Sequence, residues 1–176
     1  MMSDIAKKYV KALVNSLDEK ELEALYQQLT SLLPAFKNAK FRAIAESHEL
    51  SREKKGEFLI SLIDTENPKI VNFIKLLVEK GRIALLPAIT KETGRVLEKM
   101  RNSYTGRLIS GAPVDENAIR EIEETLSKKL GAAIKLENVV TDYPGMKVEI
   151  ENLGLEIGLS MDRIKQQIAR AILSAI

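Results

Sequence analysis

The sequence changes character near residue 105, and this change constrains the fold more than any other feature. Before it, apolar residues recur at helical spacing and only three of the nine glycines occur; after it come six glycines and short alternating apolar stretches. We therefore expect a mostly α chain. It should form an N-terminal six-helix antiparallel bundle over residues 1–105, followed by a small α/β domain over residues 106–176.

Local signals predict where the helices of the bundle begin and end. The first should run from Asp4 to Leu17 with Ser3 as its N-cap. Asp18 and Glu21 form a capping-box pattern that opens the second helix, which should end near Pro34. The remaining helices are expected around Phe41–Ala45, after Ser51, from Asn67-Pro68 to Gly81, and from Ala84 to Ser103.

After residue 105, segments in which apolar residues alternate, as in strands, are mixed with segments in which they recur at helical spacing. Strands are expected over residues 107–114, 133–141, 146–151 and 155–158. Asp115 should cap a helix that Gly131 ends, and Ser160 should cap a final helix with isoleucines every four residues. The predicted order is β-α-β-β-β-α.

The composition weakens most enzymatic interpretations. The chain has no Cys, a single His and none of the motifs typical of phosphate loops, dinucleotide sites or metal hydrolases. His48 stands alone, and the basic cluster Arg52, Lys54 and Lys55 is interleaved with carboxylates, as on a solvated helix start. We expect no catalytic residues, no cofactor-binding or metal-binding residues, and no cofactor.

Charged residues interrupt every apolar run. Lys7, Lys8 and Lys11 break the first run before it reaches the length of a signal peptide's apolar region. No stretch approaches the roughly 20 apolar residues that span a bilayer. Any membrane association is therefore expected to occur through partners.

One apolar surface exceeds what the bundle core needs. On a helical wheel, the apolar residues of the first helix cover a wide arc, and Leu76 points away from the core stripe of the fifth helix. If these two helices are neighbours, Tyr9, Ala12 and Leu76 would line a groove for an amphipathic partner helix. The alternative is that other helices of the bundle bury both surfaces.

These residues lie in segments that resemble the delta subunit of bacterial F-type ATP synthase, a family that includes the mitochondrial oligomycin-sensitivity-conferring protein. The segments are IAKKYVKAL, NFIKLLVEKGRIALLPAI and GMKVEIENLGLEIGLSMDRIKQQIARAI. The second is the most specific, since Glu79, Gly81, Arg82, Leu86 and Pro87 match a family pattern of Glu-x-Gly-Arg followed by Leu-Pro. The resemblance spans nearly the whole chain.

The resemblance implies a non-catalytic stator subunit at the cytoplasmic face of the bacterial cell membrane. In that family the bundle binds the N-terminal helix of an alpha subunit between the first and fifth helices. The corresponding positions here are Tyr9, Ala12, Leu13, Phe73 and Leu76. The smaller domain meets the peripheral-stalk b subunits, and the resemblance directs this contact to the final helix around Met161, Ile164 and Ile168.

Two other classes of function compete with this interpretation. Residues 1–105 hold 18 basic and 14 acidic residues, a net charge of +4, and a nucleic-acid-binding or regulatory helical adaptor would concentrate these cations on one face. A small enzyme would instead show a pocket with converging titratable groups. The stator interpretation expects no nucleic acid partner.

Overall fold

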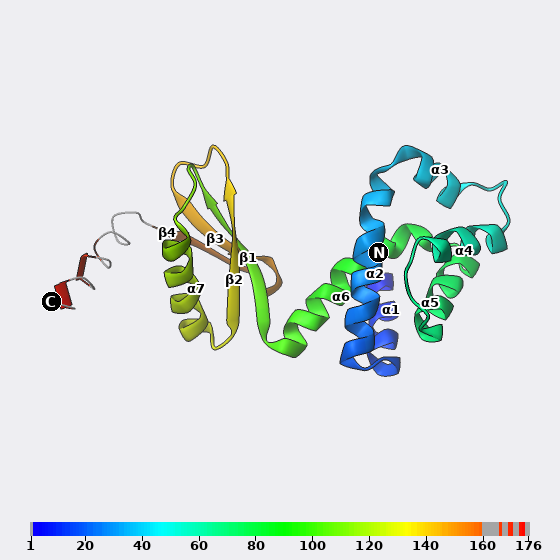
Figure 1. Ribbon diagram of the computed structural model, residues 1–176, viewed down its shortest axis with the longest axis horizontal. Helices are drawn as coiled ribbons and strands as arrows, with labels where there is room; N and C mark the ends of the chain where they lie inside the picture. Colours follow the sequence, from blue (N-terminus) through cyan, green and yellow to red (C-terminus); the bar gives the residue numbers. More distant parts are fainter. Residues whose placement is uncertain (1, 160–165, 167–168, 171–172, 175–176) are drawn as a thin grey trace. The chain divides into compact units, whose positions relative to one another are not determined.

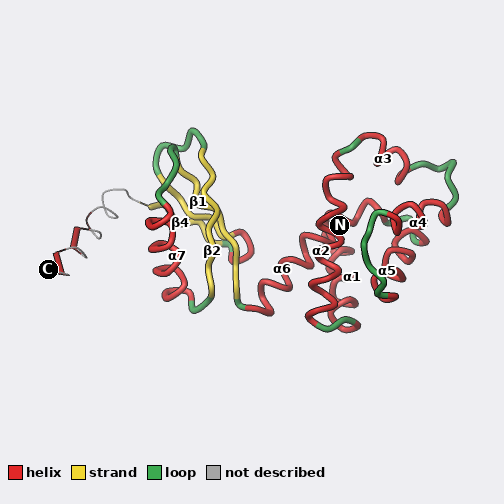
Figure 2. Tube along the Cα trace, viewed as in Figure 1, coloured by secondary structure: helices red, strands yellow, loops and turns green. Residues whose placement is uncertain are grey.

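The computed structural model describes residues 2–159, 166, 169–170 and 173–174, which are mostly helical with a small four-stranded sheet (Figure 1, Figure 2). Contacts divide the chain into two compact units, residues 1–97 and 98–176. This division falls earlier than residue 105. Glu98 belongs with the second unit because its Oε1 accepts the backbone N–H of Thr105 at 3.2 Å and its Oε2 accepts from the Asn152 amide.

Six α-helices precede the sheet. They are α1 (Met2–Ser16), α2 (Glu19–Lys37), α3 (Ala39–Glu46), α4 (Arg52–Ser61), α5 (Pro68–Glu79) and α6 (Leu86–Arg101), with the 3-10 turn η1 (Ile83–Leu85) before α6. The caps predicted at Asp18, Ser51 and Asn67 are confirmed. The side chains of Asp18, Ser51 and Asn67 accept backbone N–H groups of the first turns of α2, α4 and α5. These bonds satisfy donors that a helix N-terminus leaves free.

Three predicted boundaries are wrong. Helix α1 begins at Met2, so Ser3 lies within its first turn and is not the N-cap. Helix α2 continues past Pro34, because the ring of Phe36 in the last turn packs against Phe41, with ring centroids 5.0 Å apart. Helix α6 ends before Ser103, where a strand already begins; Asn102, at φ 49°, turns the chain directly from helix to strand.

Aliphatic side chains fill the core of the N-terminal unit. Every helix from α1 to α6 contributes, and the largest fully buried members are Val10, Leu22, Leu25, Leu29, Leu59, Ile70, Ile74, Leu77, Leu86 and Ile89. Burial of this apolar surface is the main force that holds short helices together, since isolated helices of this length are marginal in water.

The sheet has the strand order β2-β1-β3-β4. Its elements are β1 (Ser103–Ser110), α7 (Glu116–Leu130), β2 (Ala133–Val140), β3 (Met146–Ile150) and β4 (Leu155–Leu159). Strand β1 pairs in parallel with β2 through the α7 crossover, and the other pairs are antiparallel. Helix α7 lies alongside the sheet (Figure 1) and buries Leu126 against its apolar side, where Leu108, Val148 and Ile150 are fully buried.

Polar side chains of α7 occupy the outer edge of β2. The backbone N–H of Ile134 donates to Ser127 Oγ at 3.1 Å, and that of Leu136 donates to Glu123 Oε1 at 2.8 Å. The helix spacing of i and i+4 is about 6 Å, which matches the i and i+2 spacing along a strand. Side chains on one side of the helix can therefore accept hydrogen bonds from successive backbone N–H groups that an edge strand points away from the sheet.

The elements of the C-terminal unit follow the predicted order as far as the described residues reach. The first strand is wrong in position, since it spans Ser103–Ser110 rather than residues 107–114. Its pairing explains the shift, because the β1–β2 register already begins at Ser103 and Ala133. The final helix predicted after Ser160 lies outside the described residues.

Candidate functional site

Helices α1 and α5 lie next to each other in the N-terminal unit. The rings of Tyr9 and Phe73 meet edge to face, with centroids 6.2 Å apart and an interplanar angle of 71°. Lys69 Nζ, at the start of α5, donates to the backbone oxygen of Ser16 at the end of α1, at 3.3 Å. The two helices are therefore antiparallel neighbours, and being neighbours is the condition that the predicted groove set.

The five predicted positions divide into an inner and an outer set. Leu13 and Phe73 are 8% and 6% exposed and belong to the core cluster. Tyr9 is half-buried, with its ring against Phe73. Ala12 is exposed, and Leu76 keeps 40% of its surface in water. The buried pair belongs to the core of the unit, and the apolar atoms of Leu76 and Ala12 are left exposed to water.

Arg82 contacts the predicted groove residue Tyr9 and was not part of the groove prediction. Its Nη1 donates to the Tyr9 hydroxyl at 2.9 Å, and its guanidinium carbon lies 5.6 Å from the centre of the Tyr9 ring. The two contacts together fix the orientation of the half-buried ring. The only sequence signal was the position of Arg82 within the Glu-x-Gly-Arg pattern, which does not indicate a contact with the first helix.

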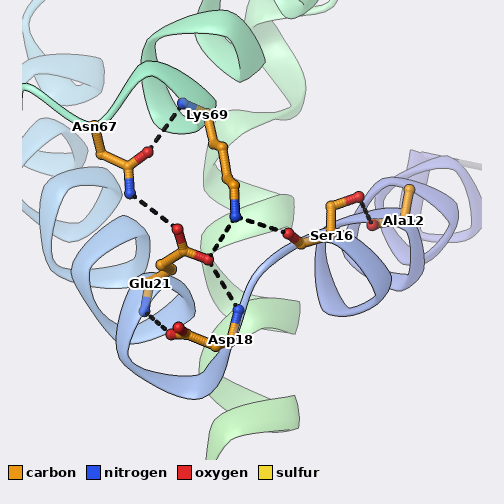
Figure 3. Close-up of polar contacts among 6 residues, drawn as sticks. All are labelled: Ala12, Ser16, Asp18, Glu21, Asn67 and Lys69. Carbon is orange, nitrogen blue, oxygen red and sulfur yellow. Dashed lines mark hydrogen bonds and ion pairs between the residues drawn. The ribbon is translucent and has the colours of Figure 1, made fainter.

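A polar cluster holds one end of α1 and α5 against the start of α2 (Figure 3). Lys69 Nζ donates to Glu21 Oε2 at 3.0 Å as well as to Ser16, and the Asn67 amide donates to Glu21 Oε1 at 3.5 Å. Glu21 Oε2 also accepts the backbone N–H of Asp18 at 3.0 Å. The Asp18 bond, then Lys69, lowers the pKa of Glu21 below its ordinary value.

A charged network covers the other side of the sheet. Glu149 accepts from Lys147 Nζ at 2.8 Å and from Arg107 Nη2 at 2.7 Å, and Lys147 lies 3.6 Å from Glu156. The hydrogen bond with Lys147 lowers the pKa of Glu149 and raises that of Lys147. These ion pairs satisfy one another, so the arrangement is typical of a solvated sheet face.

Two further findings bear on the class of function. Among the described residues, no group of three or more His, Cys, Asp or Glu side chains is placed to hold a metal ion. Within that same part of the chain, every helix is too short or too polar to cross a bilayer. The predicted stalk-contact residues Met161, Ile164 and Ile168 lie outside it.

Comparison with known proteins identifies the family. The sequence profile of the ATP synthase delta (OSCP) subunit matches residues 5–168. The ATP synthase delta subunit of Campylobacter fetus subsp. fetus is 40% identical over 177 residues, covering 100% of both chains. The chain belongs to the ATP synthase delta (OSCP) subunit family. Members of the delta (OSCP) family are non-catalytic subunits, so the chain is a subunit of ATP synthase rather than an enzyme in its own right.

A second relative and one solved structure match nearly the whole chain. The delta subunit of Campylobacter concisus is 38% identical over 172 residues, covering 98% of each chain. A chain in the cryo-EM structure of the Toxoplasma gondii mitochondrial ATP synthase hexamer superposes with a TM-score of 0.57 at 18% identity, covering 98% of this chain and 97% of that one. This second likeness shows that the fold is shared.

Proposed function

We propose that the chain links the catalytic head of ATP synthase to its peripheral stalk. The first six helices act as one antiparallel bundle that binds the N-terminal helix of an alpha subunit. The C-terminal part, around Met161, Ile164 and Ile168, contacts the b subunits. Torque from the rotating shaft would otherwise turn the head, and a tether on both sides keeps it still so that proton-driven rotation yields ATP.

One observation carries the alpha-subunit half of this proposal. Leu76, on α5, keeps 40% of its surface exposed beside the Tyr9–Phe73 contact, which packs α1 against α5. An amphipathic helix lying along α1 and α5 would cover this apolar surface. Apolar anchors suit a tether under load, because exposed ion pairs contribute little each. The proposed contact with the b subunits and the proposed location at the cytoplasmic face of the membrane both rest on family membership.

Calorimetry with a peptide of the alpha-subunit N-terminus tests the alpha half. We expect Leu76→Asp and Tyr9→Asp each to weaken binding by roughly 2 kcal/mol or more, because a carboxylate would be placed in a desolvated apolar contact. Leu130→Asp is the matched control, since Leu130 on α7 is 37% exposed and belongs to the other unit. Unchanged affinity for both site variants would refute the assignment of the groove.

Comparing the binding of labelled DNA with the binding of this peptide distinguishes the adaptor function from the stator function. A nucleic-acid adaptor would bind labelled DNA with an affinity that falls steeply with salt. The stator proposal expects no DNA binding at low salt and an affinity for the peptide that depends little on salt.

A further inference from the structure

Three nitrogen-bearing side chains gather around one cavity on the N-terminal unit. His48 comes from the α3–α4 connection, and Arg52 and Lys55 come from the first turn of α4. The cavity has a volume of about 390 Å³, within the size range of small-molecule sites. The sequence alone had favoured a solvated helix start for these basic residues, and the fold instead brings two of them and the single histidine to one place.

Apolar residues also line the cavity. Ala45 of α3, Val78 of α5 and Ile83 of η1 line it, and all three are buried members of the core cluster. Helix α3 packs against η1, and α4 packs against α5. The core of the unit therefore holds the apolar part of the lining in place, and the cavity is lined by both cationic and apolar residues.

The polar side chains on the cavity have no partner within the described residues. His48, Arg52, Lys55 and the single lining carboxylate, Glu46, make no hydrogen bond or ion pair there. The lining holds two cations, Arg52 and Lys55, and one carboxylate, so it carries a net positive charge that an anion bound beside the two cations would neutralise. The positive end of the α4 dipole adds to the same field, because Arg52 is its first residue.

We propose that this cavity binds a phosphate monoester with a small apolar body. Arg52 and Lys55 would each form charge-assisted hydrogen bonds to the phosphoryl oxygens, with His48 as a third donor. The body would lie on Ala45, Val78 and Ile83. Inorganic phosphate would leave these apolar residues uncovered, so it should bind more weakly than the ester. The inference does not depend on the proposed stator function, since the cavity is lined by residues of α3, α4, η1 and the end of α5 and by none of the five predicted groove residues.

NMR titration of the full chain with phenyl phosphate tests the proposal. We expect saturable shifts of the His48 ring and of amides between residues 45 and 55, with weaker binding of inorganic phosphate and none of phenol. Arg52→Gln and Lys55→Gln should each weaken phenyl phosphate binding about tenfold, the loss expected for a charge-assisted bond. Lys54→Gln is the matched control, because Lys54 is exposed and does not line the cavity.

Two results would overturn the proposal: an absence of saturable shifts, or an equal loss of affinity for Lys54→Gln and Lys55→Gln, which would indicate only a diffuse positive field. A second arm identifies the source of the phosphoryl group. If vesicles containing phosphatidic acid bind the chain, lose binding with Arg52→Gln and are displaced by phenyl phosphate, the ligand is a lipid headgroup. If phenyl phosphate binds and the vesicles do not, the site takes a soluble ester. Each of these two results supports the site.

Discussion

Glu21 connects three helices through one carboxylate. It accepts from Asp18 in its own capping box and from Lys69 on α5, and Lys69 also binds Ser16 on α1 (Figure 3). These bonds favour the charged form, which is why the pKa of Glu21 is lowered. The ionisation state of the Glu21 side chain therefore affects the hydrogen bonds that join α1, α2 and α5.

The sign of the pH dependence follows from this lowered pKa. The contribution of Glu21 to stability is fully present above the pKa of the unfolded chain, about 4.3 for Glu, and is lost as the pH falls through the lower folded pKa. We expect the difference in unfolding free energy between the wild type and Glu21→Gln to shrink as the pH falls below about 4.3. Urea unfolding across that range measures it.

Lys69→Met serves as the companion variant. It removes the second cause of the lowered pKa and leaves the backbone bond from Asp18 in place. In Lys69→Met, the part of the pH dependence of the unfolding free energy that comes from Glu21 should then be reduced but not abolished. A difference in unfolding free energy between the wild type and Glu21→Gln that stays constant with pH would contradict the role assigned to the Glu21 carboxylate.

Residues that act locally were predictable from the sequence, and those that act across the chain were not. The Asp18–Glu21 capping box needs only a spacing of three residues, and Asn67 caps the helix that follows it. The bond from Arg82 to Tyr9 joins positions 73 apart. No periodicity reveals such a contact, so the predicted site contained Tyr9 without the residue that orients it.

At the level of elements, two helix glycines have opposite surroundings. A Cβ at Gly94 on α6 would lie 2.8 Å from Cε2 of Tyr26, whereas a Cβ at Gly56 on α4 would meet only Val78, at an ordinary 3.9 Å. Glycine in a helix interior costs roughly 0.5–1 kcal/mol relative to alanine. Close packing therefore explains Gly94 but not Gly56.

We expect alanine to have opposite effects at the two positions. Gly56→Ala should raise the unfolding free energy by about 0.5–1 kcal/mol, because the methyl group fits and the unfolded chain loses freedom. Gly94→Ala should lower it by about 1 kcal/mol or more, because Tyr26 must move. Thermal and urea unfolding of both variants provide the measurement. A higher unfolding free energy for Gly94→Ala would show that the Tyr26 ring moves aside without a loss of stability.

The outer edge of β2 gives a second prediction at this level. Edge strands with free amides invite pairing with other chains, and Ser127 and Glu123 occupy two of these amides. In Glu123→Ala/Ser127→Ala, we expect faster hydrogen exchange at Ile134 and Leu136 and concentration-dependent self-association, measured by light scattering. Glu124→Ala, an exposed neighbour without such a bond, should change neither. Unchanged exchange in the double variant would refute this role.

Element types were predictable where the pattern was long and bounded by caps. Helix α7 follows Asp115 and ends at Gly131, which adopts φ 64° as a left-handed cap requires. The errors fall where tertiary contacts override local signals, as at Pro34, or where pairing decides the boundary, as at Ser103. A proline usually ends a helix, but here the packing of Phe36 continues it.

At the scale of the whole molecule, the change of sequence character near residue 105 indicated two differently built parts. The structure places the division at residues 97 and 98. It lies inside α6 because the last turn of that helix belongs with the sheet: Glu98 binds Thr105 and Asn152. Periodicity could not show this, since Glu98 continues the helical pattern of α6 while its side chain accepts hydrogen bonds from Thr105 and Asn152 of the C-terminal unit.

The Tyr9 site has a practical consequence for spectroscopy. The chain contains four tyrosines and no tryptophan, and one of these phenols lies under a guanidinium and against Phe73. In a complex with a peptide that carries a tryptophan, the peptide would therefore be the sole source of indole emission. Energy transfer from Tyr9 to that indole would report docking in real time, without any dye attached to the protein.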